Sequence, residues 1–144
     1  MEPFVARELA TVAHRGQLDK AGRPYIEHPA RVAAAVAHGL GPRHPAVAVA
    51  WLHDVVEDTA VTLEELASQL TAEQLSALDA LTHRDGETRE SYLLRVKQHP
   101  WAASVKRADI ADNSATERLA LLDGATRERL MRKYARDVEM LAAQ

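Results

Sequence analysis

The chain has 144 residues, of which 47% are hydrophobic and 27% charged, and its formal net charge is −3. These values are typical of one globular domain and argue against extensive disorder and against a broad basic surface for nucleic acid. Because cysteine is absent, disulfides and thiolate metal sites are excluded, and only His, Asp and Glu remain as candidate metal ligands.

The first third of the chain predicts three helices separated by turn residues. Apolar side chains at helical spacing predict a helix over 3–15, and residues 16–29, with two Gly and two Pro, predict a long connecting loop. A second helix covers 30–40 and ends at the following glycines. A third covers 44–58, with Pro45 near its start.

The remainder of the chain continues the helical pattern. Two consecutive segments open with a threonine followed three residues later by Glu or Gln, which is the pattern of a capping box. The residues after Leu81 predict a surface turn, and Asp123-Gly124 interrupts the last long stretch. The expected helices cover 62–70, 71–82, 91–98, 102–122 and 126–144.

These elements predict a compact all-α fold. The sequence shows no alternating strand pattern, low-complexity linker or internal repeat, so we expect residues 1–144 to form a single domain of about seven or eight helices. No apolar run approaches the roughly 18 residues that span a bilayer, and the N-terminus lacks the apolar core of a signal peptide. We therefore expect a cytoplasmic protein without membrane contact.

Ionisable side chains gather in the stretch WLHDVVEDT. On a continuous helix His53 would neighbour Glu57, and Asp54 would neighbour both Glu57 and Asp58. Such a row of carboxylates repels itself unless a cation, a basic group or water offsets the charge. Taken alone, the pattern is also explained by a solvated acidic helix end.

A second acidic group lies in VKRADIADNSATER, where Asp112, Asn113 and Thr116 follow Asp109 at helical spacings. An exposed face paired with neighbouring basic residues would also explain this group. His28, at a helix entrance before Pro29, is a further candidate. Together His28, His53, Asp54 and Asp109 offer two imidazoles and two carboxylates, a donor set that suits Mn²⁺, Fe²⁺ or Zn²⁺.

These segments resemble the HD-domain metal phosphohydrolases, and among them the ppGpp hydrolase domain of the RelA/SpoT family and its small stand-alone alarmone hydrolases. The shared order is a His-Pro, a His-Asp, a Glu-Asp three residues on, and a distant Asp followed four residues later by Asn. The resemblance covers about residues 10–117.

The resemblance implies a role for each matching residue. It implies that His28, His53, Asp54 and Asp109 bind the metal, and that Glu57 and Asp58 position or activate the attacking water. It places Lys20, Tyr25, Asn113 and Thr116 at the substrate. Mn²⁺ is the implied ion, with Fe²⁺, Zn²⁺, Ni²⁺ or Mg²⁺ as alternatives, and the implied reaction removes the 3′-pyrophosphate of guanosine tetra- or pentaphosphate.

Other functions stay open at this stage. Asp19 stands where the family has a basic residue, and an acid beside a polyphosphate is unfavourable, so another phosphorylated nucleotide is an alternative substrate. A nucleotide-binding module without turnover and a helical interaction domain are the non-enzymatic alternatives. The expected partner is a small-molecule nucleotide, with no nucleic acid, and the sequence leaves a monomer or a homodimer open.

Overall fold

The computed structural model describes residues 1–142, apart from the side chain of Thr116. In these residues the fold is helical, and its only strand-like feature is an isolated bridge between Leu18 and Pro24. Within residues 1–142, seven helices have seven residues or more, and three are short. In chain order they are α1 (Pro3–Ala13), α2 (Glu27–Leu40), α3 (Ala46–Leu52), α4 (Val55–Asp58), α5 (Leu63–Ala67), α6 (Ala72–Leu81), α7 (Arg89–Lys97), α8 (Pro100–Asn113), α9 (Thr116–Leu119) and α10 (Gly124–Ala142). The prediction of an all-α bundle is confirmed.

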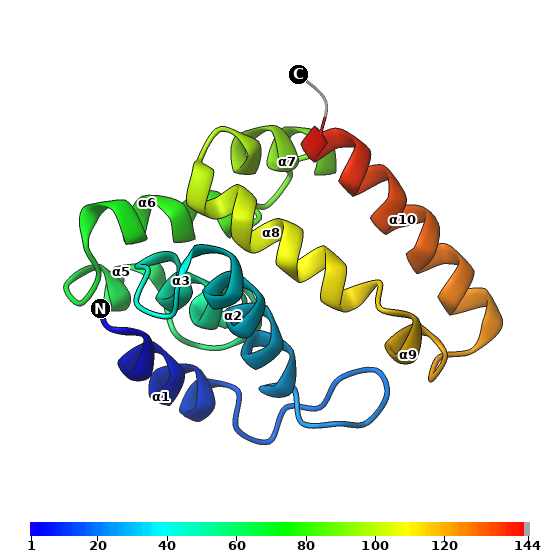
Figure 1. Cartoon of the computed structure of the whole chain (residues 1–144), viewed down its shortest axis with the longest axis horizontal. Coiled ribbons are helices and arrows are strands. Elements are labelled where there is room, and N and C mark those ends of the chain that lie inside the picture. Colours follow the sequence, from blue (N-terminus) through cyan, green and yellow to red (C-terminus); the bar gives the residue numbers. More distant parts are fainter. Residues whose placement is uncertain (143–144) are drawn as a thin grey trace.

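Helices α3 and α8 form the interior of the bundle. Helix α3 contacts α1, α2, α6 and α8, while α8 lies between that group and α10 (Figure 1). The side chains of α3 are almost all buried Ala and Val, whose small size allows neighbouring helices to approach closely. The C-terminal end of α3, which leads directly into His53, is therefore inside the protein.

Side-chain caps fix several helix starts, as the sequence predicts. Thr62 accepts a hydrogen bond from the backbone N–H of Glu65, and Thr71 forms a complete capping box with Gln74. At the start of α8 the side chain of His99 accepts from the N–H of Trp101, and Pro100 occupies the first helical position. These caps satisfy backbone N–H groups that have no partner within the first helical turn.

Two of the expected helices are interrupted, and both breaks lie beside the acidic motifs. The helix expected over 44–58 stops at Leu52, and Asp54 is the N-cap residue of the separate short helix α4. The helix expected over 102–122 ends at Asn113, after which α9 forms a single turn. Asp and Asn are weak helix formers whose side chains bond more favourably elsewhere, which explains both breaks.

Helix α2 begins earlier than expected, at Glu27, so His28 lies in its first turn rather than before it. None of the helices described for residues 1–142 is long and apolar enough to cross a membrane.

Candidate metal centre and adjoining cleft

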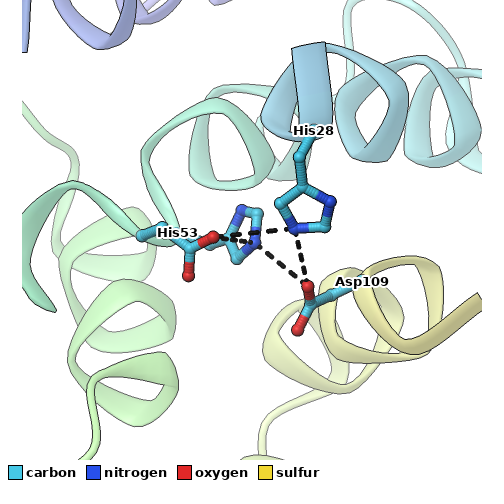
Figure 2. Close-up of side chains that lie close together, drawn as sticks. His28, His53 and Asp109 are labelled. Atoms are coloured by element: carbon cyan, nitrogen blue, oxygen red, sulfur yellow. Dashed lines mark hydrogen bonds and ion pairs between the residues drawn. The ribbon is translucent and has the colours of Figure 1, made fainter. Parts of the chain in front are cut away.

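Four side chains from three separate segments converge in the interior. His28 comes from the start of α2, His53 from the break between α3 and α4, and Asp109 from α8 (Figure 2). Asp54 follows His53 in the same break. Each offers one ligand atom, and these four atoms lie within 4.8 Å of one another. The structure thus brings together the four residues predicted as metal ligands.

The distances are those of a tight cluster. His28 Nε2 lies 2.8 Å from Asp109 Oδ1 and 3.6 Å from Asp54 Oδ2. His53 Nε2 lies 3.1 Å from Asp54 Oδ2 and 3.4 Å from Asp109 Oδ1. Both imidazoles are 3% exposed, so water has little access to the charged groups of the cluster, and these groups must be compensated by one another or by a bound ion.

The other nitrogen of each ring faces away from the cluster and contacts an acceptor. His53 Nδ1 lies 2.7 Å from the carbonyl oxygen of Ala50, and His28 Nδ1 lies 2.6 Å from Asp112 Oδ2. A carbonyl or carboxylate can only accept, so the proton of each ring is held on Nδ1. In the neutral rings both Nε2 lone pairs therefore point at the two carboxylates, and buried His53 Nε2 makes no hydrogen bond in the described structure. Four converging lone-pair donors fit a divalent cation.

The electrostatics of the cluster favour positive charge at its centre. Burial lowers the pKa of His28 and His53, but the adjacent carboxylates outweigh this effect and both pKa values lie above 6.5. Burial raises the pKa of Asp54, yet His53 outweighs it and brings that pKa to about 2. The pKa of Asp109 lies well below its usual range despite burial, because Lys106 and the imidazoles stabilise its charge. Both carboxylates are thus ionised at neutral pH.

Two neighbours of Asp109 on α8 complete its surroundings. The ammonium of Lys106, a buried side chain, lies 2.9 Å from Asp109 Oδ2, and Asn113 Nδ2 donates to Asp109 Oδ1 over 3.0 Å. The alternative explanation of the acidic segment, an exposed face paired with basic residues, would leave Lys106 in contact with solvent. Lys106 is instead buried, so this face of α8 points into the protein.

Tyr25 and the acidic pair lie on the solvent side of the cluster. The hydroxyl of Tyr25 donates to Asp54 Oδ2 over 2.6 Å, so this residue contacts a predicted ligand directly. Glu57 accepts a hydrogen bond from the backbone N–H of His83, and Asp58 faces a cleft. Partial burial raises the pKa of both Glu57 and Asp58, with the charge of Asp54 adding to the shift.

A cleft of about 550 Å³ adjoins the cluster. Tyr25 and Asn113, which contact Asp54 and Asp109 respectively, form part of its wall, so these two side chains lie between the cleft and the cluster. The structure therefore places three of the four predicted substrate residues here, whereas the side chain of the fourth, Thr116, lies outside the described part. The wall combines polar and apolar side chains, among them Lys20, Arg23, Tyr25, Asp58, Asn113, Arg118, Leu119, Leu122 and Tyr134.

Both carboxylate oxygens of Asp19, the acid in the predicted substrate loop, have partners within the protein. Its Oδ1 accepts from the backbone N–H groups of Ala21 and Arg23, each over 2.9 Å, which closes the loop on itself. Its Oδ2 lies 3.4 Å from Nη2 of Arg118. Arg118 lines the cleft, and the sequence did not indicate this residue because it lies 99 positions from Asp19. The acid therefore does not stand as an unpaired charge in the cleft.

The HD-domain family model matches residues 6–137, so the chain belongs to the HD domain family. The predicted resemblance to this family is confirmed.

Curated relatives extend the comparison over part of their own length. The chain is 42% identical over 77 residues to a guanosine-3′,5′-bis(diphosphate) 3′-pyrophosphohydrolase of Haemophilus influenzae, a match covering 54% of this chain and 11% of that protein. It is 35% identical over 122 residues to a probable GTP pyrophosphokinase of Mycobacterium leprae, covering 78% and 15%. It is 34% identical over 119 residues to the bifunctional (p)ppGpp synthase/hydrolase SpoT of Escherichia coli, covering 75% and 17%.

A solved structure of a metazoan ortholog of SpoT that hydrolyses ppGpp has the same fold. The two structures align with a TM-score of 0.79 over 98% of this chain and 85% of the other, at 19% identity. At this identity the comparison supports the all-α architecture of the HD domain.

Proposed function

We propose that this chain is a metal-dependent phosphohydrolase that removes the 3′-pyrophosphate of guanosine tetra- or pentaphosphate. The observation that carries the proposal is the His28, His53, Asp54 and Asp109 cluster beside a cleft whose Tyr25 and Asn113 hold two of its carboxylates. Relatives with ppGpp hydrolase names support the substrate. Mn²⁺ is the proposed ion, because the donor set is nitrogen and oxygen without sulfur.

A divalent cation in this cluster would lower the pKa of a water and polarise a phosphoryl oxygen. Glu57, whose pKa is raised, is the proposed base that accepts the proton of the attacking water, and Asp58 orients that water from the cleft wall. Water adds to the phosphorus next to the ribose, the bond to the ribose 3′-oxygen breaks, and that oxygen takes up a proton. The products are pyrophosphate and GDP or GTP.

The cleft residues divide between the phosphates and the base. Lys20 and Arg118 supply positive charge for phosphate oxygens, while Tyr134 and the leucines offer an apolar surface for a nucleobase. The location in the cytoplasm, the oligomeric state and the role proposed for Thr116 remain predictions.

The experiment is product analysis with a matched control. Protein stripped with EDTA and reloaded with Mn²⁺ is incubated with ppGpp, and the products are separated by ion-exchange chromatography. We expect GDP and pyrophosphate from the wild type and from Asp79→Asn, a half-exposed carboxylate on α6 that pairs with Arg84, but not from Asp109→Asn. Equal turnover by Asp109→Asn and the wild type would contradict the assigned site.

A second candidate is a phosphatase acting on another nucleotide. Asp19 favours it, because this acid engages Arg118 and thereby reduces the positive charge available to a polyphosphate. The same assay on a nucleotide panel separates the candidates, since orthophosphate release from a monophosphate without ppGpp cleavage would favour the second. Tight nucleotide binding without any product would instead favour a non-catalytic module.

A further inference from the structure

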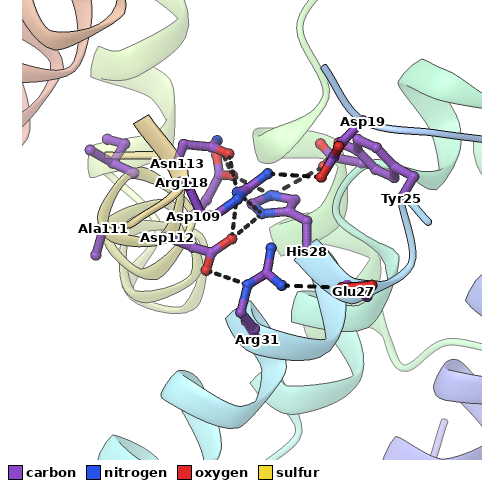
Figure 3. A network of polar contacts seen from close by, with 12 residues as sticks. Asp19, Tyr25, Glu27, His28, Arg31, Asp109, Ala111, Asp112, Asn113 and Arg118 are labelled. Carbon is purple, nitrogen blue, oxygen red and sulfur yellow. Dashed lines mark hydrogen bonds and ion pairs between the residues drawn. The ribbon is translucent and has the colours of Figure 1, made fainter. Parts of the chain in front are cut away.

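The carboxylate of Asp112 joins a predicted metal ligand to two arginines. Its Oδ2 lies 2.6 Å from His28 Nδ1 and accepts from Arg118 Nη1 over 2.8 Å, while Oδ1 accepts from Arg31 Nε over 2.7 Å (Figure 3). The side chain is 12% exposed, so these contacts are largely shielded from water. Asp112 lies one turn beyond Asp109 on α8, so one helix presents a carboxylate to each nitrogen of the same imidazole.

This arrangement separates the roles of the two carboxylates. Asp109 contacts Nε2, the nitrogen in the cluster, whereas Asp112 contacts Nδ1 on the other side of the ring. Asp112 is therefore outside the set of converging ligand atoms. Because its oxygen can only accept, it keeps a proton on Nδ1 and directs the Nε2 lone pair toward the cluster.

The neighbours of Asp112 keep its carboxylate ionised and in place. Burial raises the pKa of Asp112, but the contacts with His28 and Arg31 outweigh it, so this pKa lies below its ordinary value. The hydrogen bonds from Arg31 and Arg118 also hold the carboxylate in position. Arg118 also donates to Asn113 Oδ1 over 3.1 Å, and Asn113 in turn donates to Asp109. The charge of Asp112 is thus satisfied within the protein, and its geometry is fixed from both sides.

We propose that Asp112 is a positioning residue that fixes the tautomer and orientation of His28 as an Nε2 metal ligand, and so raises the affinity of the cluster for its ion. The inference rests on the metal site of the proposed function but not on the nucleotide. Partners of this kind contribute about 10- to 100-fold to metal affinity.

The test measures metal affinity directly. Mn²⁺ binding to the EDTA-stripped protein is followed by isothermal titration calorimetry for the wild type, Asp112→Ala, Asp112→Asn and the control Asp79→Ala. We expect Asp112→Ala to weaken binding about 10- to 100-fold. Asp112→Asn should weaken it less, because the amide oxygen can still accept from Nδ1 while exposed Arg31 turns away. Asp79→Ala should bind as the wild type.

A spectroscopic measurement separates positioning from a general loss of structure. In Zn²⁺-loaded, ¹⁵N-labelled protein, the Nδ1 proton of His28 should give a low-field resonance in the wild type that shifts upfield or vanishes in Asp112→Ala. Unchanged affinity in Asp112→Ala, within about threefold, or an unchanged His28 resonance would overturn the inference. Should Asp112→Ala fold poorly by circular dichroism, the same two measurements on Asp112→Leu decide, because Leu keeps the side-chain volume but offers no acceptor to Nδ1.

The failure of the proposed function has a different signature. Equal Mn²⁺ affinity in the wild type and Asp109→Ala would overturn the metal site, and the role of Asp112 with it. Absence of ppGpp cleavage with normal Mn²⁺ binding would overturn only the substrate, because no part of the binding measurement depends on a nucleotide.

Discussion

Replacing Lys106 with Met tests whether the buried charges around Asp109 balance one another. The Lys106 ammonium lies 2.9 Å from Asp109 Oδ2, and the two side chains are 11% and 8% exposed. With an effective dielectric constant of about 20, the attraction of such a pair is about 6 kcal/mol before the cost of desolvation. Removing one partner of a buried pair costs about 3–5 kcal/mol, because the remaining charge is left without compensation.

The lower end of that range is expected here. Asp109 keeps its contact with His28 and the hydrogen bond from Asn113 after Lys106 is replaced, and Met retains most of the buried apolar stem. We therefore predict that Lys106→Met lowers the free energy of unfolding of the metal-free protein by about 3 kcal/mol, or roughly 10 °C in Tm. With saturating Mn²⁺ the loss should be smaller, because the bound cation compensates Asp109.

Urea denaturation in EDTA and in Mn²⁺ measures both quantities. Arg107→Met is the matched control, since Arg107 is exposed on the same helix and should lose less than about 1 kcal/mol. A loss below 1 kcal/mol for Lys106→Met would refute the reasoning, because it would show that Asp109 does not need this cation. A loss that is equal with and without Mn²⁺ would refute the link between Lys106 and the metal centre.

Three further predictions concern the centre itself. Asp54→Ala should lose Mn²⁺ binding and hydrolysis together while its circular dichroism stays helical, and retained turnover would argue against this ligand. Glu57→Gln should keep Mn²⁺ affinity but lower kcat by about 10²- to 10⁴-fold, and loss of the metal would reassign Glu57 as a ligand. In EDTA, stability should fall as pH rises above about 6.5, because the raised pKa values of His28 and His53 stabilise the fold only while both are protonated. With Mn²⁺ the trend should reverse, since the metal requires neutral imidazoles, and urea midpoints at about pH 6 and pH 9 check the sign.

The sequence was sufficient to predict the helical class, whereas the four residues that converge were assigned to one site through the resemblance to the HD-domain family. Small apolar residues at helical spacing made α3 recognisable as an interior helix, and His53 and Asp54 follow that apolar run directly in the sequence. The threonine caps of α5 and α6 were also readable, because a capping box is a local interaction. Features that depend on contacts between residues three or four positions apart could thus be predicted from the sequence.

Contacts between distant segments could not be read in this way. Arg118 meets Asp19 across 99 positions, and Asp112 meets His28 across 84, so nothing in either local pattern indicates the partner. The break before α4 was missed for a related reason. A continuous helix satisfies the local spacing of His53 and Glu57 equally well, and the preference of Asp54 for its contacts with His53 and Tyr25 arises only in the folded protein.

The acid at position 19 illustrates how a charge that is unfavourable in the sequence can be accommodated in the structure. Asp19 holds its own loop through two backbone N–H groups and contacts Arg118 with its other oxygen. Arg118 also contacts Asp112, so it connects the loop beside the cleft with the carboxylate that orients His28. An incoming phosphate would compete with Asp19 for the same guanidinium, and at 3.4 Å the contact between Asp19 and Arg118 is longer than the usual charge-assisted bond. Asp19 therefore lowers the positive charge of the cleft but leaves Arg118 able to contact a phosphate, which is compatible with a phosphorylated nucleotide as substrate.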